Sequence, residues 1–445
     1  MVSLILPGRA CCRPSCSSLR AVARDRLILS SSSGQQSSPR FFHSIPPARA
    51  SDSQDPSSSS SSRISYRVAV SSSGKGRRFH PFRNAHTFDP SLHDALGLVT
   101  KESNPLIRRR TRPDSGADAF FVSKVGHDLT SGGHDNGAVA FAVADGVGGW
   151  EESRVDPAEF SHGLCGYMAQ SALSWSSPAE KLRPKNLMQM GYDQVVADEW
   201  IRAGASTASV GVAWDDGRVE LANLGDSGSV LFRSAAVQHY STAQTHGFNT
   251  PYQLSLIPPR MRAQASIFGG AYLEDYPRDA AVTSLNMQHG DVLMLATDGV
   301  FDNLNNQDIL KLVTRQMTLT GAWTGAPPTY AIGPSDQLDK VSKPGGLTDL
   351  LSPPNKNNNN NANTNNNDAE RYKTFTLSSL LATTIAGKAK LASLDLRRDS
   401  PFAKQYQRYY PFDHYRGGKV DDICVLVVVA VDEGRVQGQG QGSES

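Results

Sequence analysis

The chain has 445 residues, enough for one large domain or two of ordinary size, and only 38% of them are hydrophobic. Twelve of the 45 Lys and Arg residues but only three of the 43 acidic residues lie in the first 80 positions, so the rest of the chain is net negative although the whole carries +2. A net acidic body argues against a nucleic-acid partner. No stretch reaches the roughly 18 consecutive apolar residues of a transmembrane segment.

The N-terminal segment, residues 1–50, contains seven Arg and eleven Ser but a single acidic residue, Asp25. A cationic segment of this kind is typical of an organellar presequence, of the mitochondrial or chloroplast type, although a disordered basic tail is the alternative. Three of the five cysteines lie in this segment, so import would leave Cys165 and Cys424. We expect these two to be buried thiols in a reduced compartment.

Low-complexity stretches suggest the domain boundaries. Residues 51–90 are rich in Ser and Gly, and we predict a disordered linker because too few large apolar side chains are present to offset the loss of chain entropy. A second stretch, about 325–370, includes an Asn-rich run and is predicted to be a surface insertion. We therefore predict one domain over 91–433 with this insertion, followed by a disordered tail over 434–445.

Apolar runs bounded by turn residues predict the strands between these limits. An Asp-Asp-Gly turn separates two of the runs and predicts a hairpin. The predicted strands cover residues 139–144, 206–214, 218–224, 292–296 and 424–431.

Two segments predict helices. Asp156 is a candidate N-cap, with proline in the first turn and Glu159 at the capping-box position, and apolar residues follow at helical spacing. Residues 186–202 form the second candidate. Hairpins combined with long helices predict an α+β domain in which helices cover antiparallel sheets.

Aspartates stand at the ends of three of these apolar runs. Asp145 ends one run and Gly146 follows it, so one strand end can offer a carboxylate and a backbone carbonyl. Asp298 ends a second run, and Asp421 precedes the last. An isolated Asp-Gly usually forms only a turn. Three ionised carboxylates brought together repel one another, and a bound cation is the simplest way to offset this repulsion and keep them ionised. Oxygen ligands of this kind suit Mg²⁺ or Mn²⁺ better than zinc.

The strings that contain these aspartates resemble the metal-dependent serine/threonine protein phosphatases of the type 2C family. They occur in the order SGADAFFV, AVADGVGGW, GASTASVGVAW, LANLGDSGSVLFR, TDGVFDNL and KVDDICVLVVVAV. DGVGGW and QTHGFNTPYQL are similar to the mitochondrial branch of the family in particular. The resemblance implies a central antiparallel β-sandwich flanked by helices on both faces.

Site roles follow from this resemblance position by position. It implies that Asp145 bridges two cations, that Gly146 gives its carbonyl to one of them, and that Asp298 and Asp421 bind the other. Asp118 matches the acidic residue that lies near the waters of the metal site.

Three further positions are implied with less direct matches. Asp226 and Asp302 correspond to positions that hold a third cation in family members, with structural turn roles as the alternative. Arg112 is the nearest candidate for the phosphate-binding arginine, although it is displaced by about one residue from the family position.

Two departures from the family pattern leave the activity open. Ala117 stands where many members have Glu, and Val147 stands where many have the His that protonates the leaving group. The leading hypothesis is a mitochondrial phosphatase, in the matrix, that hydrolyses phosphoserine and phosphothreonine with a water activated by two cations. A catalytically weakened or inactive binding protein on the same fold is the alternative, and an unrelated metal hydrolase is a third reading.

The expected partners follow from the same resemblance. They are phosphoproteins, and the likeness to the mitochondrial branch implies that proteins of coenzyme Q biosynthesis are among them.

Overall fold

The computed structural model describes residues 63–91, 95–97, 105–126, 137–267, 271–326, 328, 330–351 and 374–435. All of them belong to one compact unit, Ser59–Ser445. The predicted presequence, the Asn-rich run and the last ten residues of the predicted tail lie outside the described residues.

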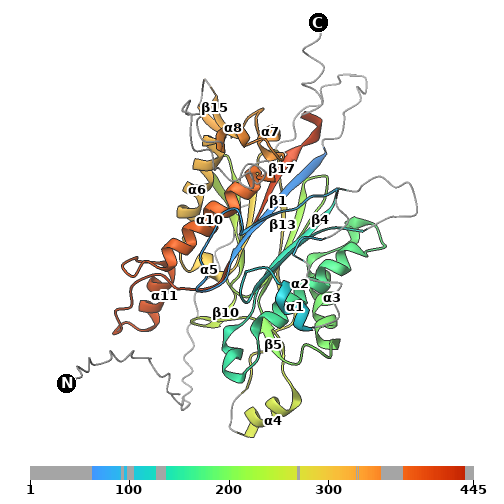
Figure 1. Ribbon diagram of the computed structural model, residues 1–445, viewed down its shortest axis with the longest axis vertical. Coiled ribbons are helices and arrows are strands. Elements are labelled where there is room, and N and C mark those ends of the chain that lie inside the picture. The colour runs from blue at the N-terminus through green and yellow to red at the C-terminus, as the bar shows by residue number, and fades with distance from the viewer. Residues whose placement is uncertain are drawn as a thin grey trace, which may run out of the picture. The chain divides into compact units, whose positions relative to one another are not determined.

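Two antiparallel sheets form the centre of the described structure (Figure 1). The first has the strand order β2-β1-β17-β14-β8-β9, and the second has the order β13-β7-β6-β4-β3. The strands of the first sheet are β1 (Ile64–Ser73), β2 (Ala85–Thr87), β8 (Gly228–Arg233), β9 (Ala236–Tyr240), β14 (Val292–Ala296) and β17 (Ile423–Asp432). Those of the second are β3 (Asp118–Lys124), β4 (Val139–Asp145), β6 (Ala208–Ala213), β7 (Arg218–Leu224) and β13 (Ala281–Asn286).

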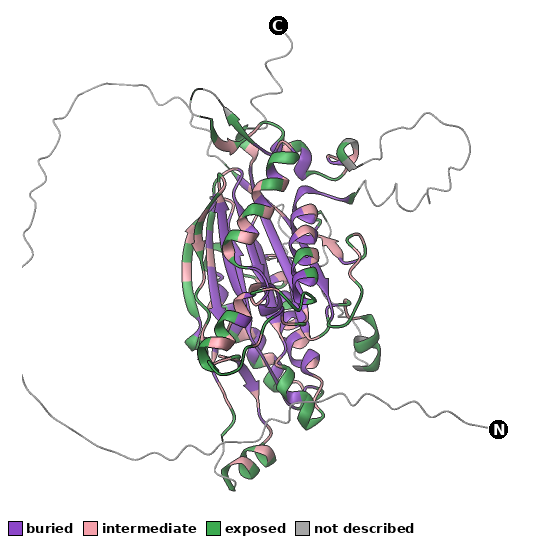
Figure 2. Cartoon of the chain, turned by 90° about the vertical axis from the view of Figure 1, so that its left-hand side faces the viewer, coloured by how far each residue is buried: buried purple, intermediate pink, exposed green. Residues whose placement is uncertain are grey.

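Helices cover the outer face of each sheet, so the described layers are helix, sheet, sheet and helix (Figure 2). Helices α2 (Pro157–Leu173) and α3 (Pro184–Ala197) pack on the second sheet. Helices α6 (Asn306–Leu319) and α10 (Leu377–Ser393) pack on the first. The predicted α+β sandwich between helices is confirmed.

Shorter elements connect these layers. The helical ones are α1 (Pro105–Thr111), α4 (Pro259–Ile267), α5 (Asp298–Phe301), α7 (Leu338–Ser342), α8 (Thr348–Leu351) and α11 (Pro401–Tyr409). The short strands are β5 (Gly204–Ser206), β10 (Thr245–Gly247), β11 (Thr250–Pro251), β12 (Leu254–Leu256), β15 (Trp323–Ala326) and β16 (Ala331–Pro334). None of the described helices is long and apolar enough to cross a membrane.

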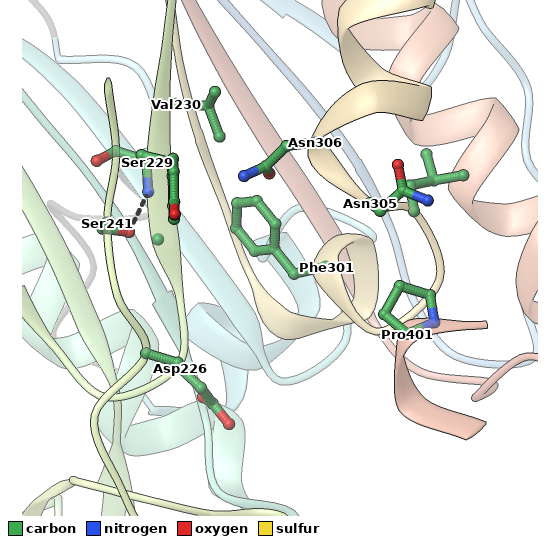
Figure 3. Close-up of a pocket in the computed structure, with 12 residues that line it drawn as sticks. Asp226, Ser229, Val230, Ser241, Phe301, Asn305, Asn306 and Pro401 are labelled. Atoms are coloured by element: carbon green, nitrogen blue, oxygen red, sulfur yellow. Dashed lines mark hydrogen bonds between the residues drawn. The ribbon is translucent and has the colours of Figure 1, made fainter. Parts of the chain in front are cut away.

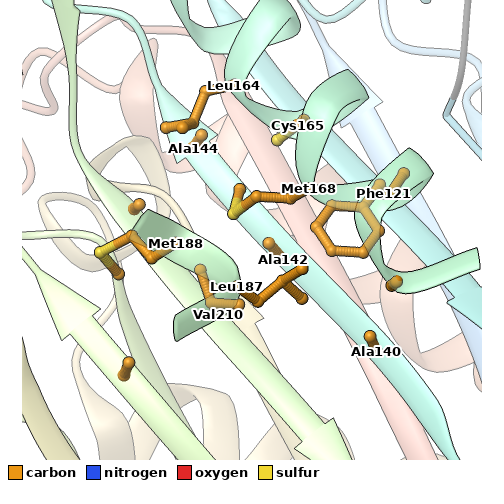
Figure 4. Close-up of a cluster of buried hydrophobic side chains, with 14 of the residues drawn as sticks. Phe121, Ala140, Ala142, Ala144, Leu164, Cys165, Met168, Leu187, Met188 and Val210 are labelled. Atoms are coloured by element: carbon orange, nitrogen blue, oxygen red, sulfur yellow. The ribbon is translucent and has the colours of Figure 1, made fainter. Parts of the chain in front are cut away.

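Three apolar cores hold the layers together. The core between the sheets receives alternate residues of strands on both sides, among them Tyr66, Phe141 and Leu426. The core under α2 and α3 interleaves Leu164 and Met168 with small strand residues (Figure 4). Each large side chain buried in this way contributes about 1.5–3 kcal/mol to the free energy of folding. The packing fixes the strand ends, and with them the side chains that follow each strand.

The start of α2 agrees with the sequence prediction, but the end of α3 does not. Asp156 caps α2 by accepting a hydrogen bond from the backbone N–H of Ala158. Helix α3 ends at Ala197, whereas the prediction extended it to residue 202. The side chain of Asp198 accepts hydrogen bonds from the backbone N–H of Trp200 and the hydroxyl of Tyr167, which stabilises a turn instead of another helical turn.

The predicted disordered linker over residues 51–90 is wrong for Ile64–Ser73, which form strand β1, and for Ala85–Thr87, which form β2. Strand β1 pairs with β17 along its whole length and with β2 on its other side. Its alternating residues Ile64, Tyr66 and Val68 face the core between the sheets. The buried serines that end the strand misled the composition argument, so the domain begins before residue 91.

The predicted low-complexity insertion is also too wide at its start. Within about 325–370, β16 and α7 are regular structure, and Leu338 of α7 is fully buried in the core under α6 and α10. Residues 352–373, which include the Asn-rich run, lie outside the described part of the chain.

Candidate metal centre

Three carboxylate side chains meet where strands of both sheets end. Carboxylate oxygens of Asp145, Asp226 and Asp298 lie within 4.8 Å of one another. Asp145 is the last residue of β4, Asp226 lies in the turn after β7, and Asp298 begins the short helix α5 directly after β14. Each side chain is delivered by an apolar strand whose buried residues fix its direction.

Asp118 joins this group from the neighbouring strand. It is the first residue of β3 and pairs in register with Asp145 of β4. Its Oδ2 accepts a hydrogen bond of 2.8 Å from the hydroxyl of Thr297, which in turn accepts one from the backbone N–H of Cys424. Thr297 therefore ties β3, β14 and β17 together at the site.

Burial makes this part of the site unfavourable for charge. Removal from water raises the pKa of Asp118, Asp145 and Asp226 well above the ordinary value, and the neighbouring aspartates raise it further. The Oδ1 atoms of Asp118 and Asp226 are buried without a hydrogen-bond partner among the described residues. A set of clustered carboxylate oxygens, some of them unpartnered, fits a hard divalent cation.

A lysine occupies the other side of the cluster. The Nζ of Lys419 lies 2.5 Å from Asp298, 2.7 Å from Asp302 and 3.1 Å from Asp421. It also donates to the Oδ1 of Asn249 at 3.1 Å. Three carboxylates are thus already paired with one ammonium of the chain itself.

The ammonium changes the titration of these acids. Burial raises the pKa of Asp298, but Lys419 and the surrounding hydrogen bonds outweigh it, and the net shift is downward. Burial and the charge of Asp298 raise the pKa of Asp302 to about 7 in spite of Lys419. Lys419 therefore holds Asp298 ionised more firmly than Asp302.

Asparagine 303 fixes the backbone that carries this lysine. Its buried amide donates to the carbonyls of Gly299 and Lys419, and its Oδ1 accepts from the backbone N–H of Lys419. The turn after β14 is thereby locked to the segment that leads into β17. The motif analysis assigned no role to Asn303, Thr297 or Lys419.

The neighbours of the predicted ligands show why the turns are built from these residues. A Cβ atom at Gly146 would lie 2.6 Å from the carbonyl oxygen of Pro157, so only glycine fits there. Asp422, beside the predicted ligand Asp421, accepts hydrogen bonds from the backbone N–H groups of Ala117 and Lys75. The second acid of the pair therefore fastens the turn before β3.

Arg112 lies beside the start of α2 and is engaged there. Its guanidinium pairs with Asp156 at 3.0 Å and with Glu159 at 3.4 Å. Its described ion pairs do not include an aspartate of the cluster. Phosphate binding by Arg112 stays a prediction, and it requires exchange of these two ion pairs.

A known protein family matches part of this chain. The family model described as protein phosphatase 2C matches residues 124–327. Over these residues, a little under half of its length, the chain is similar to the protein phosphatase 2C family. This confirms the resemblance read from the ordered motifs.

Two curated proteins are similar to part of this chain. It is 36% identical over 242 residues to Protein phosphatase 2C homolog 7, mitochondrial, of Saccharomyces cerevisiae, a match that covers 54% of this chain and 66% of the yeast protein. It is 36% identical over 201 residues to the Protein phosphatase PTC7 homolog of Homo sapiens, covering 44% and 59%. The chain thus spans just under two thirds of the yeast relative and less of the human one.

Among solved structures, the photosystem II phosphatase PBCP aligns with a TM-score of 0.46 and 24% identity. That alignment covers 71% of this chain and 91% of that one.

Proposed function

We propose that this protein is a metal-dependent phosphatase that hydrolyses phosphoserine and phosphothreonine in proteins. The meeting of Asp145, Asp226 and Asp298 within 4.8 Å, in a chain similar to this family, is the observation that carries the proposal. The buried, unpartnered carboxylate oxygens support a site for Mg²⁺ or Mn²⁺.

Four groups of the chain would hold two of these cations. These groups are Asp145, Asp298, Asp421 and the backbone carbonyl of Gly146. Two bound cations lower the pKa of a water molecule and neutralise charge on the phosphoryl oxygens.

Asp226 and Asp302 would hold a third cation. The position of Asp302 is less free, because its carboxylate already pairs with Lys419 at 2.7 Å.

The chain's own groups orient the reactants around that centre. Asp118 keeps one oxygen engaged by Thr297 and its other oxygen buried without a partner, so the second can accept a hydrogen bond from water in the site. Lys419 keeps Asp298 ionised, which preserves its capacity to bind a cation. These two side chains act by positioning and by charge.

The decisive experiment measures phosphate release from a phosphoserine peptide with and without Mn²⁺ or Mg²⁺. Asp298→Asn should reduce turnover by about 10²–10³-fold or more, because a ligand of the centre is weakened. Asp193→Asn is the matched control, since Asp193 is exposed on α3 and Asn can preserve its contact with Gln189. Equal turnover in the two variants, or no turnover in the unmodified protein, would refute the proposal. The alternative of an inactive binding protein predicts the second result.

The cellular setting is part of the same proposal. The name of the yeast relative places that protein in mitochondria, and the Arg- and Ser-rich residues 1–50 support import of this chain to the same compartment. Its substrates would then be mitochondrial phosphoproteins, with those of coenzyme Q biosynthesis included by resemblance. A phosphoproteome of mitochondria lacking the protein tests this, because phosphorylation of true substrates must rise.

A further inference from the structure

A cleft runs from the metal centre along the edge of the first sheet. Two cavities, of about 270 Å³ and 460 Å³, share Tyr240 and Asn306 in their walls. We refer to them together as the β9 cleft. Their sizes are of the same order as those of ordinary ligand pockets, which are about 300–1,000 Å³.

The β9 cleft is continuous with the carboxylate cluster. Asp226 belongs to the cluster and also lines the first cavity. In Figure 3, Ser229 and Ser241 stand on one wall, Phe301 and Asn306 stand opposite, and Asp226 lies at one end. A phosphoryl group bound at the cluster would therefore have the β9 cleft directly beside it.

The position of the strand leaves the β9 cleft accessible. β9 is the outermost strand of its sheet in the described structure, with β8 on one side. Tyr240 is 60% exposed at the point where the two cavities join. Extended ligands can bind beside exposed edge strands of this kind.

The wall chemistry indicates what kind of segment fits. Asp226 is the one acidic residue among the 16 described lining residues, and Lys and Arg are absent from that lining. Seven of the 16 carry hydroxyl or amide side chains, and most of the others are apolar. The Nε2 of His239 and the Oδ1 of Asp226 are buried without hydrogen-bond partners among the described atoms. Such walls suit the backbone and uncharged side chains of an extended peptide.

We infer that the β9 cleft binds the extended stretch of substrate polypeptide adjacent to the phosphorylated residue. This inference rests on the proposed phosphatase function. It assigns specificity to residues outside the metal centre. Small phosphate esters, which have no polypeptide, do not use the β9 cleft.

The test compares two substrates in each protein variant. Ala243→Trp places a large ring in the cleft from an exposed lining position, and Ala281→Trp makes the same change at an exposed position on the edge strand of the other sheet. For each variant, kcat/KM is measured for a phosphoserine peptide and for p-nitrophenyl phosphate. The ratio of peptide to ester should fall about tenfold in Ala243→Trp, through KM, and stay unchanged in Ala281→Trp.

A second variant covers the case in which Ala243→Trp fails to fold. Tyr240→Ala removes an exposed ring and should lower the same ratio by about threefold to tenfold. An unchanged ratio in both variants would overturn the inference while leaving the phosphatase proposal intact. Absence of turnover on both substrates in the unmodified protein would instead remove the function on which it rests.

Discussion

The two halves of the candidate metal centre differ in how their charge is balanced. In one half, Asp118, Asp145 and Asp226 are buried together, and removal from water raises the pKa of each. In the other half, the ammonium of Lys419 lies within 3.1 Å of the carboxylates of Asp298, Asp302 and Asp421. Among the described ion pairs, none joins the first half to an ammonium or guanidinium group, whereas the second half contains the ammonium of Lys419.

Because of this difference, the two halves should contribute differently to the stability of the metal-free protein and to cation binding. Clustered carboxylates without a counter-charge destabilise the metal-free protein, and a bound cation restores that free energy. A cluster that holds its own ammonium is more stable without metal, but it offers less binding energy to an added ion. Variants in the two halves should therefore have opposite effects on the metal-free protein.

Removal of the ammonium should have the largest effect. Lys419→Met leaves Asp298, Asp302 and Asp421 without their shared cation, and we expect the free energy of unfolding in EDTA to fall by about 3–5 kcal/mol. Urea unfolding measures this, with Lys388→Met on the exposed side of α10 as the control. The stabilisation gained on adding Mn²⁺ should be larger in Lys419→Met than in the unmodified protein. Equal losses in the two variants would show that the ammonium has no special role.

Removal of a carboxylate from the unpaired half should act in the opposite direction. Asp145→Asn takes one charge out of a buried group of acids, so the metal-free protein should gain about 1–2 kcal/mol while its affinity for Mn²⁺ falls. Asp298→Asn should instead lower the stability of the metal-free protein, because Lys419 loses its nearest partner. Thermal unfolding in EDTA and calorimetry with Mn²⁺ provide the two measurements. A gain in stability for both variants would contradict the division into two halves.

A smaller effect is expected from pH. In the unfolded chain, Asp302 loses its proton near pH 4, but in the folded chain its pKa is raised to about 7. The folded protein therefore binds more protons between these values, and its stability must fall as the pH rises through this range. We expect the thermal midpoint in EDTA to drop by about 5 °C between pH 5 and pH 8. Saturating Mn²⁺ should abolish the decline, and a midpoint that rises with pH in EDTA would refute this account.

The sequence indicated much of the fold because local signals and tertiary structure agree in most elements. The apolar runs that end at Asp145 and Asp298 are strands β4 and β14, and Asp156 caps α2. β1 was missed because its last three residues are serines, and burial of serine in a sheet depends on partners far away in the chain. Composition alone carries no information about such partners.

The candidate metal centre was likewise predictable from the sequence only in part. The aspartates could be found because each stands next to an apolar strand. Thr297, Asn303 and Lys419 could not be assigned roles, because their contacts join segments separated by more than 100 residues. The β9 cleft likewise arises only when the turn after β7 meets the start of α6. Motifs locate ligands, but the surrounding hydrogen bonds and cavities are visible only in three dimensions.

The pairing of β1 with β17 has a consequence for how the protein matures. Ile64 lies opposite Asp432, so two strands at the centre of the first sheet come from distant parts of the chain. The sheet cannot close until β17 has left the ribosome, and contacts of such long sequence separation form slowly. Asp421, which lies just before that strand, is one of the three carboxylates paired with Lys419. A chain still being synthesised therefore lacks the central strand pair of this sheet until its last strand is available.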